Sequence, residues 1–387
     1  MRLSGFRLPS GIYLGYGATR LTVEFFTIFH WKRVMILAGD IGGTKINLAL
    51  YDWNKERVDP IREDTVWTAD YESLEEVLTE FLEEPPPADS ESDEAVDDTD
   101  EPSSGSIRPA PLGPLTAACF GVPGPVLNNI CHATNIPWTI DGGKLAEFLN
   151  IPRVHLLNDL EATAYGLQLL RQDEIENLNP NAPSPPPDGT RVLLAAGTGL
   201  GESLLLWTGS EYRICPSEGG HADFAPTNDL EIDLLRYLRT SHLHVSYERV
   251  LSGPGLHSIY QFLRDTKKNE PTWFAEKLPT GDPAALIAEA GLTGKPDICR
   301  DALQIFISIY GAEAGNMALK ALALGGVYLG GGIAPKILPA LQQETFMKAF
   351  LAKGRYKRLL GKIPVRVILN PHTALLGAAS VAAGMTT

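Results

Sequence analysis

The alternation of apolar and polar residues near residue 40 predicts two strands joined by a glycine turn. Residues 34–38 are almost wholly apolar, as expected of a buried strand. Apolar residues then recur at every second position from 46 to 50, which is the period of a strand. Between these runs, Asp40 is followed by Gly42 and Gly43, where the backbone can turn in ways closed to other residues. The pattern therefore predicts a strand, a tight turn and a second strand.

The same patterns predict further elements along the chain. Strands are expected at 58–68, 115–122, 154–157, 192–196, 203–207, 325–332 and 365–369. Helices are expected at 71–83, 142–150, 160–170, 229–239, 301–324 and 374–383. A further helix is expected to follow the segment 248–255 and to end at residue 263. The unit of strand, glycine turn and strand occurs near residue 40 and again at 191–207. This repetition predicts two similar halves.

Composition and charge limit the functional classes. The 387 residues, 44% hydrophobic and 21% charged, suit a globular protein of two domains, and no apolar run reaches the length of a membrane span. The net charge of −14 includes ten acidic residues at 83–101 and +4 from the first 34 residues, which leaves about −8 for the remainder. Nucleic-acid binding is therefore not expected. Four scattered cysteines suit a reducing cytosol, so a cytoplasmic location is predicted.

Two segments depart from the globular pattern. Residues 1–34 are basic and rich in aromatic residues, and are either a targeting leader or upstream sequence with Met35 as the working start. We favour the second interpretation, because Met35 directly precedes the first core strand, and expect an extension that is not part of the folded core. Residues 85–114 are rich in Pro, Ser, Asp and Glu, which predicts a disordered surface insertion. An acidic docking peptide is the less favoured alternative.

The first glycine turn has a chemical as well as a structural interpretation. Backbone N–H groups in such a turn point into one concavity and can bind an anion. Thr44 adds a hydroxyl, and Asp40 could hold a hydrated Mg²⁺. An ordinary Gly-Gly hairpin with a surface Asp would give the same pattern, and this segment alone does not separate the two.

Three glycine elements in a fixed order carry a family resemblance. The segments 40–44, 197–201 and 330–332 resemble the phosphate-1, phosphate-2 and adenosine motifs of the sugar kinase/actin/Hsp70 superfamily. The blocks between them are similar to bacterial-type glucokinase over 35–385, namely Asn158-Asp-Leu-Glu-Ala-Thr-Ala, Ser217-Glu-Gly-Gly-His-Ala-Asp-Phe-Ala-Pro, His244-Val-Ser-Tyr-Glu-Arg-Val-Leu-Ser-Gly-Pro-Gly and Leu329-Gly-Gly-Gly-Ile-Ala-Pro. The related repressor/ORF/kinase proteins carry a cysteine-rich zinc motif. No cysteine cluster follows His221 here, so no structural metal is expected.

The resemblance implies a fold and an activity. The expected fold is α/β, a two-domain ribonuclease-H-like (actin-like ATPase) fold with the active-site cleft between the domains. A small domain would comprise 35–168 with 370–387 returning to it, and a large one 169–369. The implied reaction is phosphoryl transfer from ATP, with Mg²⁺, to the 6-hydroxyl of D-glucose. A homodimer is expected, and no membrane partner.

The resemblance also implies site residues. Asp159 would accept the proton of the attacking hydroxyl, although it could instead be only a helix N-cap. The implied sugar contacts are Asn135, Asn158, Asp159, Glu218, His221 and Glu248. His221 alone would more often be a structural histidine, and Glu248 could be the acidic member of a helix-start pair with Arg249. The nucleotide contacts would be Asp40, Gly42, Gly43, Thr44, Gly197, Thr198, Gly199, Gly330, Gly331 and Gly332, with Asp40 on the Mg²⁺ side, through water.

Three other functions compete with this hypothesis. A kinase for mannose, fructose or N-acetylmannosamine would share the same core. A sugar sensor that does not catalyse would bind without turnover, which the intact Asp159 and glycine motifs argue against. A chaperone or filament protein would hydrolyse ATP but would lack the cluster of Asn, Asp, Glu and His.

Overall fold

The computed structural model describes residues 35–53, 59–83, 114–133, 136–266 and 270–386. The predicted extension at 1–34 and nearly all of the predicted insertion at 85–114 lie outside the described residues. All of the described residues belong to one compact unit. The division into a small and a large domain therefore stays a prediction.

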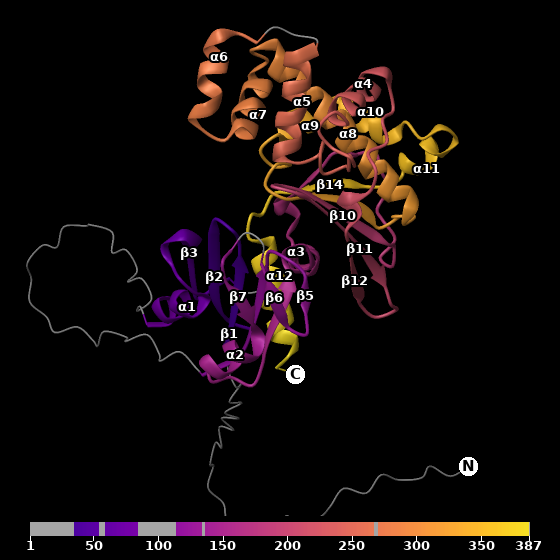
Figure 1. Cartoon of the computed structure of the whole chain (residues 1–387). Helices are drawn as coiled ribbons and strands as arrows, with labels where there is room; N and C mark the ends of the chain where they lie inside the picture. Colours follow the sequence, from indigo (N-terminus) through magenta and orange to yellow (C-terminus); the bar gives the residue numbers. More distant parts are fainter. Residues whose placement is uncertain (1–34, 54–58, 84–113, 134–135, 267–269, 387) are drawn as a thin grey trace, which may run out of the picture. The chain divides into compact units, whose positions relative to one another are not determined.

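The first sheet contains the predicted strand–turn–strand unit (Figure 1). Its strand order is β3-β2-β1-β4-β8. The neighbours of β2 are antiparallel to it, whereas β1, β4 and β8 run parallel to one another. The bounds are β1 (Met35–Ile41), β2 (Lys45–Asp52), β3 (Arg62–Trp67), β4 (Leu115–Val122) and β8 (Val154–Asn158).

The second sheet repeats this topology. Its order is β12-β11-β10-β13-β14-β9, with three antiparallel strands followed by parallel pairing of β10, β13 and β14, and with β9 as an added antiparallel edge. The bounds are β9 (Ile175–Asn177), β10 (Arg191–Ala196), β11 (Leu200–Trp207), β12 (Tyr212–Ser217), β13 (Gly326–Gly330) and β14 (Val365–Ile368). The predicted repeat and the ribonuclease-H-like, actin-like ATPase fold are thus confirmed.

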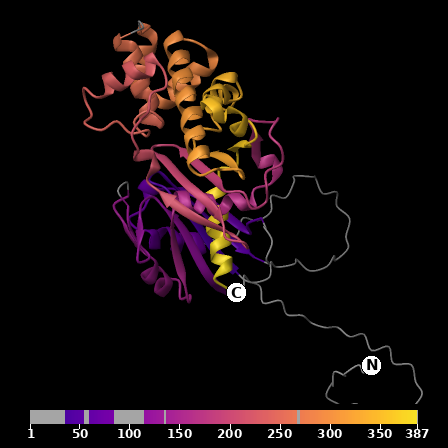
Figure 2. The same cartoon turned by 90° about the vertical axis from the view of Figure 1, so that its right-hand side faces the viewer.

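Two helices distant in sequence pack together on the first sheet. α3 (Asp159–Gly166) lies against α12 (Thr373–Gly384), and α12 also contacts β1 and β4. Figures 1 and 2 show α12, in yellow, among the strands of this sheet. The helices meet at glycines: a Cβ added to Gly377 would lie 1.8 Å from the carbonyl oxygen of Ala162. Only glycine at position 377 allows α12 and α3 to lie this close together. This close packing fixes the position of α3, the helix that begins with Asp159.

The long helix α8 (Asp297–Lys320) organises the core beside the second sheet. Its small residues have a packing reason, because a Cβ on Gly311 would lie 2.2 Å from the carbonyl oxygen of Phe346 in α10 (Glu344–Leu351). Figure 2 shows these two helices side by side. The other helices packed near α8 are α4 (Asp229–Leu238), α5 (Gly253–Thr266), α7 (Pro283–Thr293), α9 (Leu338–Leu341) and α11 (Lys357–Leu360).

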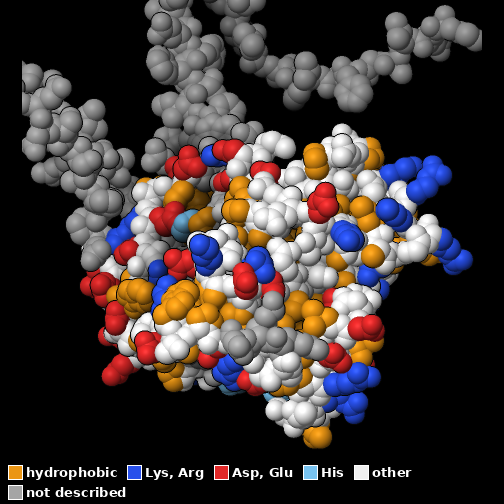
Figure 3. All heavy atoms as spheres, turned by 90° about the horizontal axis from the view of Figure 1, so that it is seen from above, with side chains coloured by type: hydrophobic (Ala, Val, Ile, Leu, Met, Phe, Trp, Pro, Cys, Tyr) orange, Lys and Arg blue, Asp and Glu red, His pale blue; other side chains and the backbone are white. Residues whose placement is uncertain are grey.

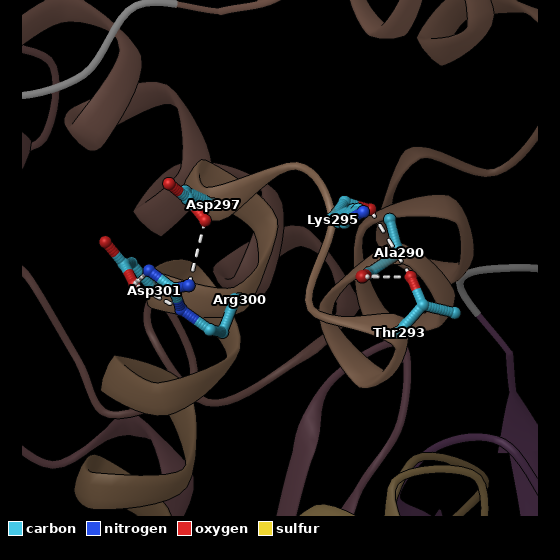
Figure 4. A network of polar contacts seen from close by, with 6 residues as sticks. All are labelled: Ala290, Thr293, Lys295, Asp297, Arg300 and Asp301. Carbon is cyan, nitrogen blue, oxygen red and sulfur yellow. Dashed lines mark hydrogen bonds and ion pairs between the residues drawn. The ribbon is translucent and has the colours of Figure 1, made fainter.

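Short-range polar contacts lie at the end of α7 and at the start of α8 (Figure 4). The Thr293 hydroxyl donates to the carbonyl of Ala290 at 2.8 Å, where the helix ends. The Arg300 guanidinium donates to Asp297 at 2.8 Å and to Asp301 at 2.9 Å in the first turns of α8. α8 therefore begins at residue 297, earlier than the predicted 301.

Several elements were not predicted. They are the small sheet of β5 (Val126–Leu127), β6 (Ile130–His132) and β7 (Thr139–Asp141), the strands β9 and β12, and the helices α6 (Thr272–Lys277), α7, α9, α10 and α11. The predicted α1 (Leu74–Glu83) and α2 (Gly142–Phe148) are present, and short 3-10 turns are η1 (Thr68–Asp70), η2 (Leu167–Leu169), η3 (Gln172–Glu174), η4 (Gly219–His221), η5 (Leu278–Thr280) and η6 (Gly354–Tyr356).

The surface is chemically mixed. Figure 3 shows acidic, basic and hydrophobic side chains interspersed on the face seen from above. Within the described part of the chain, no helix combines the length and the apolar character needed to cross a membrane.

Candidate active site

The first glycine turn is a tight hairpin between β1 and β2. The Gly42 N–H donates to the carbonyl of Lys45 at 2.8 Å. Thr68 anchors the turn from outside, because its hydroxyl donates to the Gly42 carbonyl at 2.8 Å and its N–H donates to the Thr44 carbonyl at 3.0 Å. Gly43 and Thr44 remain exposed. The predicted turn is confirmed, and its exposed tip leaves room for an anion.

Two carboxylates meet beside this turn. Asp40 pairs with Gly121 across the parallel strands β1 and β4. A Cβ added to Gly121 would lie 3.8 Å from both the Asp40 Oδ1 and the Asp159 Cα. Burial and, second to it, the charge of Asp159 raise the pKa of Asp40 to about 6. The hydrogen bond from Asn47 and the charge of His372 act in the opposite direction. The two acidic residues proposed for metal and proton chemistry therefore lie together.

The structure separates the roles of Asn158 and Asp159. Asn158 is the N-cap of α3: its Oδ1 accepts from the Leu160 N–H at 3.0 Å, and its Nδ2 donates to the Gly124 carbonyl at 3.2 Å. Asp159 is the first residue of the helix, so the alternative that it is merely the N-cap is wrong. Its Oδ1 also accepts from the Leu160 N–H, at 2.7 Å. Desolvation raises the pKa of the Asp159 carboxyl, partly opposed by the Leu160 N–H and by Asn158.

The second and third glycine elements lie against each other. The turn between β10 and β11 is closed by the Gly197 N–H, which donates to the Gly199 carbonyl at 2.9 Å. Gly331 adopts a φ of +78°, and a Cβ there would lie 2.3 Å from the carbonyl oxygen of Ala196. Thr198 is exposed, Gly330 is buried at the end of β13, and Gly332 faces open space. The elements expected to bind phosphate and adenosine thus adjoin.

Glu248 is bonded to the second turn. Its Oε2 accepts from the Leu200 N–H at 3.0 Å, and its own N–H donates to the Gly220 carbonyl at 2.9 Å. Helix α5 begins only at Gly253, and in the described part of the chain no ion pair joins Glu248 to Arg249. The alternative of a helix-start pair is therefore not supported.

Glu218 is the N-cap of the short helix η4, and His221 is its last residue. Both are exposed, and the His221 Nε2 lies 3.9 Å from the Glu218 Oε2. His221 and Glu248 line one hollow of about 330 Å³, together with Ser241, His242, Leu243, His244, Ser246 and Arg249. An exposed polar histidine on a hollow differs from a structural histidine bonded to backbone.

The predicted sugar residues fall into two groups. Asn158 and Asp159 lie at the start of α3, whereas Glu218, His221 and Glu248 lie around the second turn. The groups are linked by packing, because a Cβ on Gly201 would lie 3.1 Å from the Leu160 side chain. Over the described ranges, no hydrogen bond or ion pair joins Asp159 to the second group. Asn135 lies outside the described residues.

One buried acidic residue near the site was not predicted. Glu202 is 1% exposed on β11, and a Cβ on Gly219 would lie 2.1 Å from its Oε2. The signal in the sequence was a glutamate placed between the glycine turn at 197–201 and the predicted strand at 203–207.

Comparison with known proteins places this arrangement in a family. A family model described as glucokinase matches residues 37–385. This chain belongs to the glucokinase family. A glucokinase from Nostoc sp. is 41% identical over 366 residues, which cover 90% of this chain and 99% of the relative. A glucokinase from Synechocystis sp. is 40% identical over 370 residues, with coverage of 90% and 98%.

Solved structures of glucokinases resemble the fold. The crystal structure of a glucokinase from an Antarctic psychrotroph has a TM-score of 0.73 and 28% identity, with coverage of 90% of this chain and 99% of that one. A Balamuthia mandrillaris glucokinase crystallised with glucose has a TM-score of 0.69 at 21% identity, with coverage of 92% and 96%, and shows the fold alone. Within the described ranges, no three His, Cys, Asp or Glu side chains are grouped to bind a metal ion.

Proposed function

We propose that this chain is a glucokinase that transfers the γ-phosphoryl group of ATP to the 6-hydroxyl of D-glucose, giving glucose 6-phosphate and ADP. The observation that carries the proposal is the similarity to glucokinases along nearly the whole chain, at 41% identity over 366 residues. The three glycine elements and the acidic residues around them supply a chemical basis for the same reaction.

In the proposed reaction, Asp159 is the general base. A sugar hydroxyl is a weak nucleophile at neutral pH, so its proton must be accepted as it attacks. The proton passes to an Asp159 carboxylate oxygen while the bond from the sugar oxygen to phosphorus forms and the bond from phosphorus to the ADP oxygen breaks. The raised pKa of Asp159 suits proton acceptance, because it brings the carboxyl closer to the working pH.

The phosphates would lie between the glycine turns. Backbone N–H groups of Gly42, Gly43 and Thr44, with those of Gly197, Thr198 and Gly199, would stabilise charge on the transferring group. Gly330, Gly331 and Gly332 would leave space for the adenosine. This side of the proposal is supported by the exposed tip of the first turn and by the contact between the second and third elements.

The residues present fit Mg²⁺. Mg²⁺ in phosphoryl-transfer sites is held by one or two carboxylates, by waters and by substrate phosphates. Asp40 beside Asp159 provides such carboxylates. The pKa of Asp40 is raised because its negative charge is buried and lies near a second anionic group. When bound, Mg²⁺ would neutralise phosphate charge. Asp40 would hold it, through water.

The sugar would be recognised by directional hydrogen bonds. A site that pairs each hydroxyl rejects analogues that lack one, because the buried partner is left unsatisfied. Asn135, Asn158, Asp159, Glu218, His221 and Glu248 are the proposed contacts. We also propose a homodimer in the cytoplasm, with a small domain at 35–168 to which 370–387 returns and a large domain at 169–369.

The test is ADP release by the purified chain with ATP and Mg²⁺, with and without glucose. We expect turnover that depends on glucose. A panel of mannose, fructose and N-acetylmannosamine at equal concentration separates the competing hexose kinases, and we expect glucose to give the highest kcat/KM. ADP release at the same rate without sugar would contradict the proposal. The molar mass of the purified protein, measured by light scattering, tests the proposed homodimer.

A further inference from the structure

The turn that carries two of the proposed sugar contacts rests on a buried carboxyl group. After β12, the chain bends back over β11 through Gly219 and Gly220. A Cβ on Gly219 would lie 2.1 Å from the Glu202 Oε2, and one on Gly220 would lie 2.0 Å from the Leu200 carbonyl oxygen. The turn therefore lies flat on β11, with the Glu202 side chain directly beneath it.

Glu202 is confined in this position. It is 1% exposed, and its Oε1 is buried without a hydrogen-bond partner among the described residues. Its backbone is fixed on both sides, because β11 pairs with Leu194 of β10 and with Ser217 of β12. Ionisation of a buried carboxyl group with an unpaired oxygen costs free energy, because burial removes the hydrogen bonds to water and no protein group replaces them.

The groups that face Glu202 offset this cost only in part. From α8 come Glu313, which is fully buried, Lys320, and the buried Tyr310. Lys320 lies 3.4 Å from the Glu313 Oε1, so it pairs with Glu313. β10 and β12 contribute Leu194 and Ser217, which do not titrate, and the Glu218 and His221 side chains of the turn are exposed.

We propose that Glu202 is a positioning residue for the sugar site, whose neutral carboxyl supports the Gly219–His221 turn and whose ionisation displaces that turn and weakens glucose binding. The inference rests on the proposed function. Ionised Glu202 would be repelled by Glu313 on one side, and its route to water is blocked by Gly219 on the other. Movement of the carboxylate toward solvent must therefore move the turn that carries Glu218 and His221.

The charge change falls in the range where the enzyme would work. Burial and, second to it, the charge of Glu313 raise the pKa of Glu202 to about 7, partly opposed by the charge of Lys320. Glu313, which faces Glu202, is linked to the other sugar segment, because Asn316 donates to the Glu313 Oε2 at 2.8 Å and to the Tyr247 hydroxyl at 2.9 Å. Tyr247 immediately precedes Glu248.

The experiment is calorimetric titration of the full chain with glucose at pH 6.0 and pH 8.5, for wild type, Glu202→Gln and Glu202→Met. Both variants remove the charge and keep the side-chain length. Glu231→Gln is the matched control, because Glu231 is a buried glutamate (2% exposed) on α4 that bonds to Thr227. KM for ATP is measured in parallel.

We expect wild type and Glu202→Gln to bind glucose alike at pH 6.0 and to differ by about fivefold or more at pH 8.5, within the tenfold per pH unit that one proton allows. His221 and Glu218 are present in both proteins, so the difference reports Glu202. The KM for ATP should agree within about twofold between wild type and Glu202→Gln. The glucose affinity of Glu231→Gln should show the same pH dependence as that of wild type.

Two results would overturn the inference: the same pH dependence in wild type and both Glu202 variants, or a parallel change in KM for ATP. Glu202→Met keeps the test decisive if Glu202→Gln does not fold. A wild-type protein that fails to bind glucose at either pH would instead overturn the proposed function.

Discussion

Glu248 and Leu200 are joined by a hydrogen bond, in which the Leu200 N–H donates to the Glu248 Oε2 at 3.0 Å. Leu200 directly follows the glycine turn proposed for phosphate, and Glu248 lines the hollow proposed for sugar. One carboxylate oxygen thus fixes the geometry of the two binding segments relative to each other. Loss of this bond should affect both substrates together.

Gly199→Ala should break this connection. A Cβ at Gly199 would lie 2.6 Å from the Glu248 Oε2, so the carboxylate must move. We expect KM for glucose and KM for ATP both to rise. We also expect kcat/KM to fall about 10- to 100-fold, because the two substrates would no longer be held in the geometry that the reaction needs. Steady-state kinetics measure this. Gly384→Ala is the matched control, because a Cβ there meets open space. A change in only one KM would contradict the coupling.

Gly377→Ala should destabilise the fold at the base of the site. Its Cβ would lie 1.8 Å from the carbonyl oxygen of Ala162, so α12 and α3 must separate. Overpacking of this kind costs about 1–3 kcal/mol or more. Urea unfolding measures the loss, again beside Gly384→Ala. Stability equal to that of the control would show that the two helices do not pack as described.

The stability of the protein should fall as pH rises from about 4 to 7. The pKa of Glu202 is raised from 4.5 to about 7 and that of Asp40 from 3.8 to about 6, each mainly by burial. The folded state therefore binds protons more tightly than the unfolded state, and stability is lost as each carboxyl ionises. Glu202 accounts for at most about 3 kcal/mol. Urea unfolding of wild type and Glu202→Gln at pH 5 and pH 8 tests the sign. A pH dependence that is equally steep in the variant would contradict it.

Sugar binding should close the predicted domains on each other and expel water that would otherwise hydrolyse ATP. Small-angle scattering of the full chain should then show a smaller radius of gyration with glucose than without. Galactose, which differs from glucose at one hydroxyl, serves as the comparison sugar. No compaction at saturating glucose would count against closure.

The hydrophobic pattern predicted every strand of the first sheet and four strands of the second, but not its edge strands β9 and β12. Each strand–turn–strand unit alternates clearly, and glycine marks each turn, so 34–52 and 191–207 were assigned from local sequence. The small sheet after residue 125 and the helix α7 were missed. Their strands are only two or three residues long, and α7 is a short alanine-rich helix without a clear apolar stripe.

The candidate site was only partly predictable, because side-chain partners depend on tertiary contacts. Sequence suggested Asn158 as a sugar contact, and the structure adds that both its polar ends make protein hydrogen bonds. The proximity of Asp40 to Asp159 requires the parallel registers of β1 with β4 and of β4 with β8, which no local pattern specifies. Glu202 was missed because its importance comes from Gly219, seventeen residues away, folding back onto it.

The most direct test of the account is glucose-dependent ADP release by Asp159→Ala. Asp282→Ala is the matched control, because Asp282 also accepts a backbone N–H at a helix start, from Ala284 at 3.0 Å, without a proposed role in catalysis. We predict that Asp159→Ala lowers kcat by roughly 10²–10⁴-fold or more while glucose still binds, and that Asp282→Ala stays within about twofold of wild type. Activity of Asp159→Ala within a few fold of wild type would contradict the assignment of the base.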